Sequence, residues 1–166
     1  FQNCAKLTEV NIPDSVTEIE YQAFYGCTNL PEISIPNSVT SLGTRAFAYC
    51  TNLRDVSLSE KLTSIGMEMF RDCGLTAITI PPLVTEINSY AFQNCSALTE
   101  VNMPNSIRNI GSYAFYNCDA LSKVVIPDSV TTLGTYIFAD CELLSDVTLG
   151  TGITTIPSYA FNLCPS

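Results

Sequence analysis

The feature that most constrains this chain is an internal repeat with a period of 23 residues. All eight phenylalanines lie in one series, and all eight cysteines lie in a second series three positions later in each unit. The two series are Phe1, Phe24, Phe47, Phe70, Phe92, Phe115, Phe138 and Phe161, and Cys4, Cys27, Cys50, Cys73, Cys95, Cys118, Cys141 and Cys164. Such a period predicts a solenoid of stacked units, because one unit cannot bury its own apolar face.

One step of the cysteine series is shorter than the others. It covers 22 residues, from Cys73 to Cys95, because only one residue separates Cys73 from Leu75 where other units have two. Leu75 still supplies the leucine that begins a strand in the other units. We therefore expect the strands around Val56 and Ile78 to stay paired, with a change only in the turn.

Each unit contains two short segments in which apolar residues recur with the spacing of strands. In one unit the first segment holds Leu98, Val101 and Met103, and the second holds Ile107 and Ile110. Alternation of apolar and polar residues near the end of the first segment is typical of a half-buried β-strand. A proline follows this segment in most units, and proline lacks the N–H that would continue a hydrogen-bonded ladder. We expect two short strands per unit, stacked in parallel.

The third segment of each unit predicts a short helical turn. Ala114, Phe115 and Cys118 are one and three residues apart, which places them on one face of a helix. Residues 1–166 then form a single domain of about seven 23-residue repeats. We expect this domain to be a segment of a longer chain, because Phe1 stands in the middle of a unit.

The unit sequence resembles one class of leucine-rich repeat. Residues 35–58, IPNSVTSLGTRAFAYCTNLRDVSL, follow a pattern that is similar to the BspA-like repeats of bacterial and protozoan surface proteins, and the similarity covers essentially the whole chain. The resemblance implies a β-rich α/β solenoid: a right-handed coil with a parallel sheet on its concave side and short strands and helical turns on its convex side. It also implies an extracellular or cell-surface protein that acts in adhesion or binds a host or partner protein. Serines occupy the position where the better-known leucine-rich pattern has asparagine or cysteine; they are Ser15, Ser38, Ser106 and Ser129.

The charge and the residue types exclude several functions. Sixteen acidic residues against seven basic ones give a net charge of −9, which repels nucleic acid and anionic membranes. The apolar stretches are only a few residues long, so we expect no membrane insertion. The chain contains no histidine, which removes Ser-His and Cys-His catalysis, and it contains no phosphate-binding glycine motif. We expect neither an enzyme nor a cofactor.

The cysteine series could form either disulfides or free thiols. Stacked equivalents would have Cα atoms about 5 Å apart, a distance that permits disulfides. However, parallel side chains that point into the coil would act as small apolar groups, and a column of them offers no tetrahedral zinc cage. We expect free buried thiols and no metal site, with isolated disulfides as the alternative.

Acidic residues recur at the outward position two residues after each strand leucine. This column consists of Glu9, Glu32, Asp55, Ala77, Glu100, Lys123 and Asp146. Its five acids lie side by side on the predicted concave sheet, where like charges destabilise strand pairing. One interpretation is a binding surface for a basic protein partner, such as a host extracellular-matrix or surface protein, or for cations. The other is that exposed acids keep the sheet soluble.

Tyrosines form a second column, on the predicted convex side. Tyr90, Tyr113, Tyr136 and Tyr159 each stand two residues before a phenylalanine, in consecutive repeats. Tyrosine is common in protein interfaces, but these side chains could equally cover the neighbouring repeat. From the sequence, we therefore expect an adhesion or protein-binding solenoid that uses its concave face. The rival hypothesis is a passive spacer that projects another domain from a cell surface.

Overall fold

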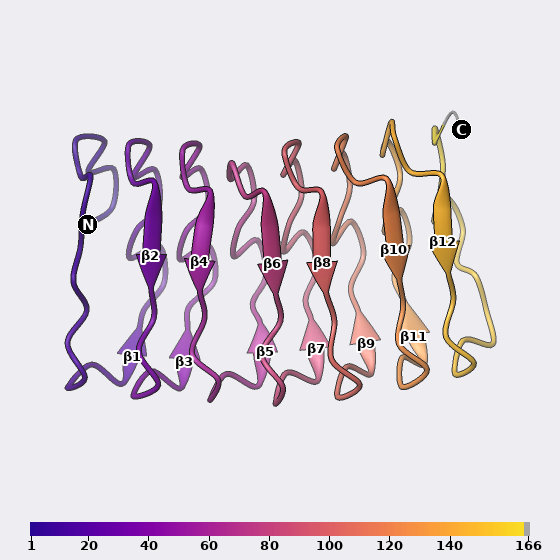
Figure 1. Cartoon of the computed structure of the whole chain (residues 1–166), viewed down its shortest axis with the longest axis horizontal. Helices are drawn as coiled ribbons and strands as arrows, with labels where there is room; N and C mark the ends of the chain where they lie inside the picture. Colours follow the sequence, from indigo (N-terminus) through magenta and orange to yellow (C-terminus); the bar gives the residue numbers. More distant parts are fainter. Residues whose placement is uncertain (165–166) are drawn as a thin grey trace.

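The computed structural model describes residues 1–164, and it is a coil of short parallel strands with two strands in each turn (Figure 1). Figure 1 shows the longer strands side by side in one row and the shorter strands in a second row. The longer strands are β2 (Glu32–Ser34), β4 (Asp55–Ser57), β6 (Ala77–Thr79), β8 (Glu100–Asn102), β10 (Lys123–Val125) and β12 (Asp146–Thr148). The shorter strands are β1 (Glu18–Ile19), β3 (Ser41–Leu42), β5 (Ser64–Ile65), β7 (Glu86–Ile87), β9 (Asn109–Ile110) and β11 (Thr132–Leu133). These strands mark six turns of a parallel β-solenoid.

The register of the strands follows the repeat. Glu32 lies opposite Asp55 and Ile33 lies opposite Val56 across β2 and β4, so equivalent residues of successive repeats are neighbours. In both strands the middle residue is buried and the two flanking residues are exposed. The predicted alternation in the first segment of each unit is therefore confirmed.

The row of longer strands is not one continuous sheet. Its strands pair as β2 with β4, β6 with β8 and β10 with β12, whereas β5, β7, β9 and β11 form a four-stranded sheet. The expectation that the strands around Val56 and Ile78 stay paired across the short repeat is therefore wrong. The same interruption separates β8 from β10, between full-length repeats, so the missing residue is not its only cause. Three-residue strands offer few ladder hydrogen bonds, and small shifts are enough to break the pairing. Val56 and Ile78 nevertheless both remain buried.

No helix occurs within residues 1–164, so the expected helical turns are wrong. Each repeat instead makes consecutive four-residue turns around its phenylalanine. In one of them the Ala91 N–H donates to the Asn88 carbonyl at 3.3 Å, and the third residue, Tyr90, has a φ of 62°. A positive φ at this position is the geometry of a type II turn.

Positive φ recurs at two positions in every repeat. The residues two before the phenylalanine are Gln22, Arg45, Glu68, Tyr90, Tyr113, Tyr136 and Tyr159. The residues two after it are Asn3, Gly26, Tyr49, Asp72, Asn94, Asn117, Asp140 and Leu163. Most of these side chains are large, and an L-residue in this conformation costs about 1–2 kcal/mol.

Hydrogen bonds to the next repeat explain why the chain accepts this cost. The Tyr90 N–H donates to the Ser112 carbonyl at 3.0 Å, and the Phe92 N–H donates to the Ala114 carbonyl at 2.8 Å. In a helix these N–H groups would bond to carbonyls of the same helix and not to the next repeat. A helix with its side chains is also about 10 Å wide. The phenylalanine rings of successive repeats lie only 5.2–5.7 Å apart, so helices do not fit a stack with this spacing.

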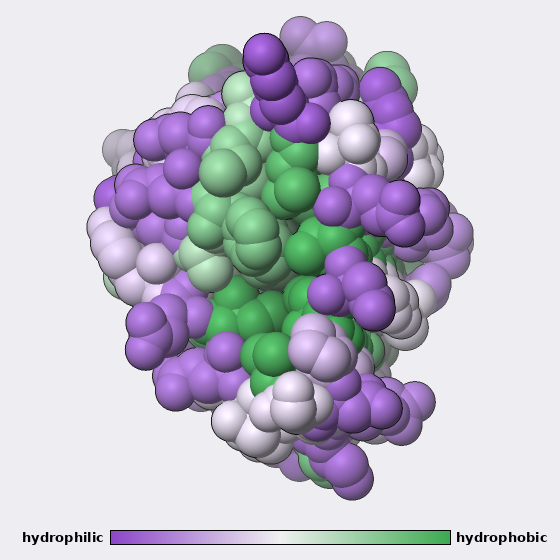
Figure 2. Space-filling model, turned by 90° about the vertical axis from the view of Figure 1, so that its left-hand side faces the viewer, coloured by the Kyte–Doolittle hydropathy of each residue, from purple (hydrophilic) through white to green (hydrophobic). Residues whose placement is uncertain are grey.

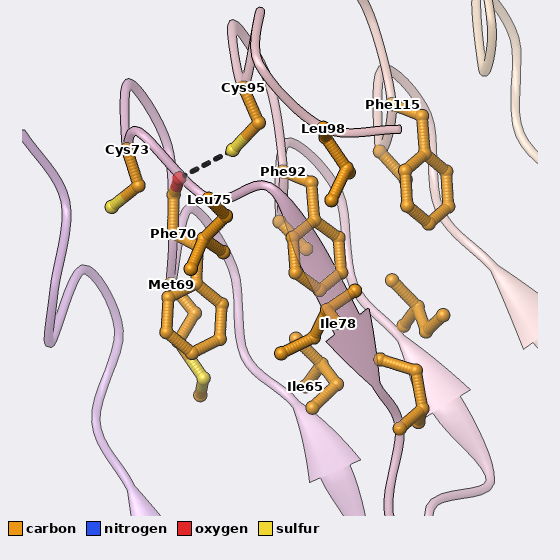
Figure 3. Close-up of a cluster of buried hydrophobic side chains, with 14 of the residues drawn as sticks. Ile65, Met69, Phe70, Cys73, Leu75, Ile78, Phe92, Cys95, Leu98 and Phe115 are labelled. Carbon is orange, nitrogen blue, oxygen red and sulfur yellow. Dashed lines mark hydrogen bonds between the residues drawn. The ribbon is translucent and has the colours of Figure 1, made fainter. Parts of the chain in front are cut away.

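The core is a column of stacked side chains that runs along the coil (Figure 3). Phe92 is fully buried between Phe70 and Phe115, and its ring is nearly parallel to both. Leucines and isoleucines of the strands pack beside the rings. The apolar interior also reaches the surface at the first repeat, where Figure 2 shows a green patch. A hollow there is lined by residues that include Phe1, Val10, Ile12, Ile19 and Phe24.

The cysteine thiols form a hydrogen-bonded column beside the rings. Each thiol from Cys27 to Cys164 donates to the carbonyl of the phenylalanine in the preceding repeat, with Sγ–O distances of 3.0–3.3 Å. Cys95, for example, donates to the Phe70 carbonyl at 3.1 Å. All eight cysteines are free, which agrees with the prediction of free thiols; Cys4 is exposed, Cys164 is half-buried and the others are buried.

We expect most of these thiols to be unreactive in the native protein. Burial raises the pKa of Cys95 and of Cys141 to about 12, so the reactive thiolate is scarce at neutral pH. A thiol reagent added to the folded protein should modify Cys4 and, more slowly, Cys164. The same reagent in denaturant without reductant should modify nearly all eight cysteines. Recovery of two thiols or fewer in denaturant would show that the column is oxidised.

Candidate binding surface

The outward side of the longer strands, here called the strand face, carries a shallow groove near the N-terminal end. Its volume is about 600 Å³, and its lining includes Glu9, Asn11, Glu32, Ser34 and Asp55. The parallel register places Glu32 of β2 opposite Asp55 of β4, and the segment before β1 brings Glu9 and Asn11 to the same groove. The groove is open and its lining is both polar and apolar, which suits a segment of another protein better than an enclosed small molecule.

Three carboxylates lie next to one another in this groove. Glu9, Glu32 and Asp55 are exposed, and none of them forms an ion pair with any residue that the structure describes. Like charges on adjacent strands repel each other and weaken the sheet. These three acids are the part of the predicted column that the structure brings together as a continuous negative surface.

The other two acids of the predicted column do not extend this surface. Ala77 interrupts the row, and Glu100 accepts a hydrogen bond from the Asn102 side chain at 3.0 Å. Asp146 lies opposite Lys123 across β10 and β12, and its carboxylate forms an ion pair with the ammonium group at 2.7 Å. The column therefore carries a continuous row of acids only at its N-terminal end, because the register places its single lysine beside an acid. Binding of a partner by the five acids stays a prediction.

The four tyrosines of the second predicted column stack on one another. Ring centroids are 5.0 Å apart from Tyr90 to Tyr113, 4.9 Å from Tyr113 to Tyr136 and 4.7 Å from Tyr136 to Tyr159. The first three side chains are half-buried, and Tyr159 is 58% exposed. These tyrosines therefore pack between repeats and also present a surface to solvent.

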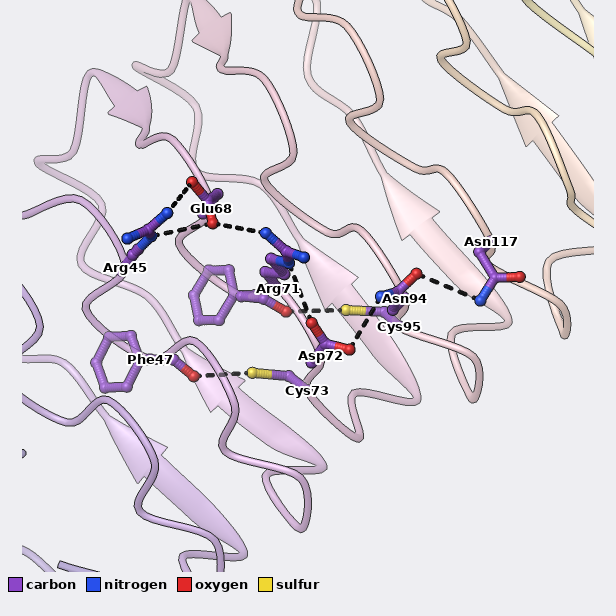
Figure 4. A network of polar contacts seen from close by, with 10 residues as sticks. Arg45, Phe47, Glu68, Arg71, Asp72, Cys73, Asn94, Cys95 and Asn117 are labelled. Atoms are coloured by element: carbon purple, nitrogen blue, oxygen red, sulfur yellow. Dashed lines mark hydrogen bonds and ion pairs between the residues drawn. The ribbon is translucent and has the colours of Figure 1, made fainter. Parts of the chain in front are cut away.

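A polar network occupies the corresponding positions in the first half of the chain (Figure 4). The Glu68 carboxylate accepts from the Arg45 guanidinium at 2.8 and 3.0 Å and from Arg71 at 3.0 Å. Arg71 also pairs with Asp72 at 3.1 Å and lies 5.8 Å from the centre of the Tyr49 ring. Burial acts to raise the pKa of Glu68, but hydrogen bonds and charge from the two arginines outweigh it and lower the pKa.

The network continues as a ladder of side-chain amides. The Asn94 amide donates to the Asp72 carboxylate at 3.0 Å, and the Asn117 amide donates to the Asn94 carbonyl oxygen at 3.3 Å. The sequence analysis missed this network. Its signal was present, because Arg45 and Glu68 stand at the same position of consecutive repeats, as do Asp72, Asn94 and Asn117.

Residues 1–164 contain neither a cluster of metal-binding side chains nor a membrane-spanning helix. No group of three or more histidine, cysteine, aspartate or glutamate side chains is arranged to hold a metal ion there. In the same residues, no helix has the length and apolar character needed to cross a membrane.

The sequence and the fold are similar to those of known proteins. A family model described as a BspA type leucine rich repeat region matches the chain in six copies, over residues 1–99 and 63–166. A solved leucine rich repeat protein of T. pallidum is 36% identical, with a TM-score of 0.78 over 84% of this chain and 64% of that protein. No curated protein matches the chain.

Two further solved structures are similar. A leucine-rich repeat protein of Bacteroides ovatus is 30% identical, with a TM-score of 0.77 over 96% of this chain and 49% of that protein. A leucine rich cell surface protein of Faecalibacterium prausnitzii is 33% identical, with a TM-score of 0.64 over 95% of this chain and 52% of that protein. The chain thus spans between about half and two thirds of the length of these three proteins.

Proposed function

Because the chain belongs to the BspA-type leucine-rich repeat family, we propose that it is the protein-binding part of a cell-surface protein and that its strand face holds a basic region of the partner. Solenoids of stacked repeats generally use their extended surfaces to bind proteins. The partner that we propose is a host extracellular-matrix or surface protein. The groove around Glu9, Glu32 and Asp55 is the site that we assign to it.

The observation that carries this proposal is the row of three unpaired carboxylates in one groove. Stability alone does not favour such a row, since a cation between the strands would relieve the repulsion, as Lys123 does beside Asp146. A partner with lysine or arginine side chains would supply the missing positive charge. The proposal concerns binding without catalysis, and the absence of histidine from the sequence supports it.

Surface location is part of the same proposal. The similar protein of Faecalibacterium prausnitzii is described as a cell surface protein. Exposed carboxylates on a cell-surface solenoid would be accessible to large partners. A passive spacer would have no need of a strand face with unpaired charges.

The test is a binding experiment with the strand face intact or neutralised. Extracellular-matrix and serum proteins are first passed over the immobilised chain to isolate a partner, and association is then measured at several salt concentrations. Long-range attraction between charges speeds association and is screened beyond a Debye length of about 10 Å at 0.1 M salt. We expect the association rate to fall as salt rises. Replacement of Glu32 by Gln together with Asp55 by Asn should weaken binding roughly tenfold, the change expected when about 1.4 kcal/mol of interaction is lost.

A matched control separates the site from the overall charge. Glu18→Gln with Glu86→Gln removes the same two charges from β1 and β7, outside the strand face, and should leave the affinity unchanged. Binding that is indifferent to salt and to the Glu32 and Asp55 substitutions would refute the assignment of the strand face. A chain that retains no matrix or serum protein would favour the spacer.

A further inference from the structure

The stacked rings of Tyr90, Tyr113, Tyr136 and Tyr159, here called the tyrosine ladder, form a second surface that the proposed function does not use. Their four hydroxyl groups have no hydrogen-bond partner among the residues that the structure describes. Burial raises the pKa of Tyr136, and the nearby hydroxyls of Tyr113 and Tyr159 raise it further. The ladder therefore presents a row of donors along one edge of an aromatic wall.

The spacing of the stacked tyrosine rings matches the repeat of a polyproline II helix. Two steps of the ladder span about 10 Å, from Tyr90 to Tyr136. A polyproline II helix rises about 3.1 Å per residue with three residues per turn, so its equivalent carbonyls recur about every 9 Å on one side. This conformation makes no internal hydrogen bonds, so its carbonyls are free to accept. In a β-strand the carbonyls on one side recur about every 7 Å, which matches neither one step of the ladder, about 5 Å, nor two steps, about 10 Å.

Negative charge lies beside the ladder near its C-terminal half. Tyr116 packs on Tyr113 with ring centroids 5.6 Å apart, and the nearby Asp140 carboxylate raises the pKa of Tyr116. Asp119 and Glu142 belong to the same acidic neighbourhood, because burial and the charges of Glu142 and Asp140 together raise the pKa of Asp119. One carboxylate oxygen of Asp119, Oδ1, is buried without a hydrogen-bond partner. A basic side chain of a bound segment would find a complementary charge here.

We propose that the tyrosine ladder binds a proline-rich segment in the polyproline II conformation, with an arginine or lysine of that segment placed beside Asp140. Proline rings pack on the aromatic wall, and alternate tyrosines of the ladder, such as Tyr90 and Tyr136, donate to every third carbonyl of the segment. Proline-rich ligands generally dock on aromatic surfaces in this way, because their conformation is already ordered before binding. The site is distinct from the strand face and does not depend on it.

The experiment titrates the folded chain with a peptide of about nine prolines followed by two arginines, which is longer than the ladder at about 3.1 Å per residue. Two altered peptides test the two parts of the proposal on the unsubstituted protein. One replaces the prolines with glycine and serine and should bind at least tenfold more weakly, because the flexible chain must first be ordered. The other replaces the arginines with serine and should bind several-fold more weakly, with less dependence on salt.

Protein variants locate the site. Tyr90→Phe, Tyr113→Phe and Tyr136→Phe together keep the stacked rings but remove the Tyr90 and Tyr136 donors and the donor between them. They should weaken binding at least tenfold, since two neutral hydrogen bonds are lost and each contributes roughly a factor of five. Tyr25→Phe, at a tyrosine outside the ladder, and the strand-face pair Glu32→Gln and Asp55→Asn should leave peptide binding unchanged. The proposal is overturned if the glycine-serine peptide binds equally well, if the triple variant binds like the unsubstituted chain, or if the proline-rich peptide shows no binding at millimolar concentration.

Discussion

Phe92→Ala is expected to lower the free energy of unfolding by about 3–5 kcal/mol, the range for a fully buried aromatic side chain that leaves a cavity. Phe92 is 0% exposed, and its ring stacks on Phe70 at 5.5 Å and on Phe115 at 5.2 Å. The substitution therefore removes two ring contacts and opens a gap in the middle of the column. Urea denaturation followed by circular dichroism measures the loss.

Phe161→Ala provides the matched comparison at the edge of the stack. Among the described residues its ring stacks on one other ring, that of Phe138 at 5.7 Å, and the side chain is half-buried. The loss should be clearly smaller, because the stability of stacked repeats is approximately a sum of interfaces between neighbours. Equal losses for Phe92 and Phe161 would mean that the chain does not behave as an array of stacked repeats.

Arg45→Met combined with Arg71→Met is expected to cost about 3 kcal/mol at pH 7, the lower end of the range for removing the partners of a buried charge. The lower end applies because both arginines are partly exposed, whereas Glu68 is only 7% exposed. Without the two guanidinium groups the Glu68 carboxylate would stay buried and unpaired. Arg54→Met with Lys61→Met removes two exposed cations that form no ion pair with any residue from 1 to 164, and it should cost little.

The cost of the arginine substitutions should depend on pH in a defined direction. In the unsubstituted protein the folded pKa of Glu68 lies below its ordinary value of 4.5. Its ion pairs therefore stabilise the fold above that pH, and this contribution is lost as the pH falls through the folded pKa. In the variant burial alone acts on Glu68 and raises its pKa, so the buried carboxyl becomes neutral on acidification. Unfolding measured at pH 7 and near pH 3 should show a smaller difference between the two proteins at the lower pH.

The residues that point inward could be predicted from the sequence because they depend only on the period. Phe47, Cys50 and Leu53 are buried as the alternation and the series require. The gain from burying apolar groups determines which residues point inward, and any fold that stacks the repeats must bury the same residues. The strands, the shared register and the free thiols follow from the same constraint.

The helical turn could not be excluded by the same reasoning. Ala114, Phe115 and Cys118 are buried, as a helix would also place them. Spacing reports which side chains are inside, but it does not report where the intervening N–H groups bond. That choice depends on the neighbouring repeat, since the Phe92 N–H donates to the Ala114 carbonyl.

The candidate site was predicted only in part, for a related reason. Glu9, Glu32 and Asp55 line one groove because they hold the same position in three consecutive repeats, with no cation between them. Lys123 and Asp146 were visible in the same column, but their ion pair depends on the lysine side chain reaching the aspartate across the strands. The buried position of Glu68 between two arginines likewise depends on side chains from different repeats.

The paired turns around each phenylalanine have a consequence for how such a chain changes length during evolution. Tyrosine rings on the turn side repeat at 4.7–5.0 Å, close to the spacing of about 4.8 Å between strands on the opposite side. Duplication of one 23-residue unit would therefore lengthen the tyrosine side of the molecule by one step of this size. Both proposed binding surfaces would then lengthen in equal steps. A gained or lost unit moves a ligand group by one interval of about 5 Å.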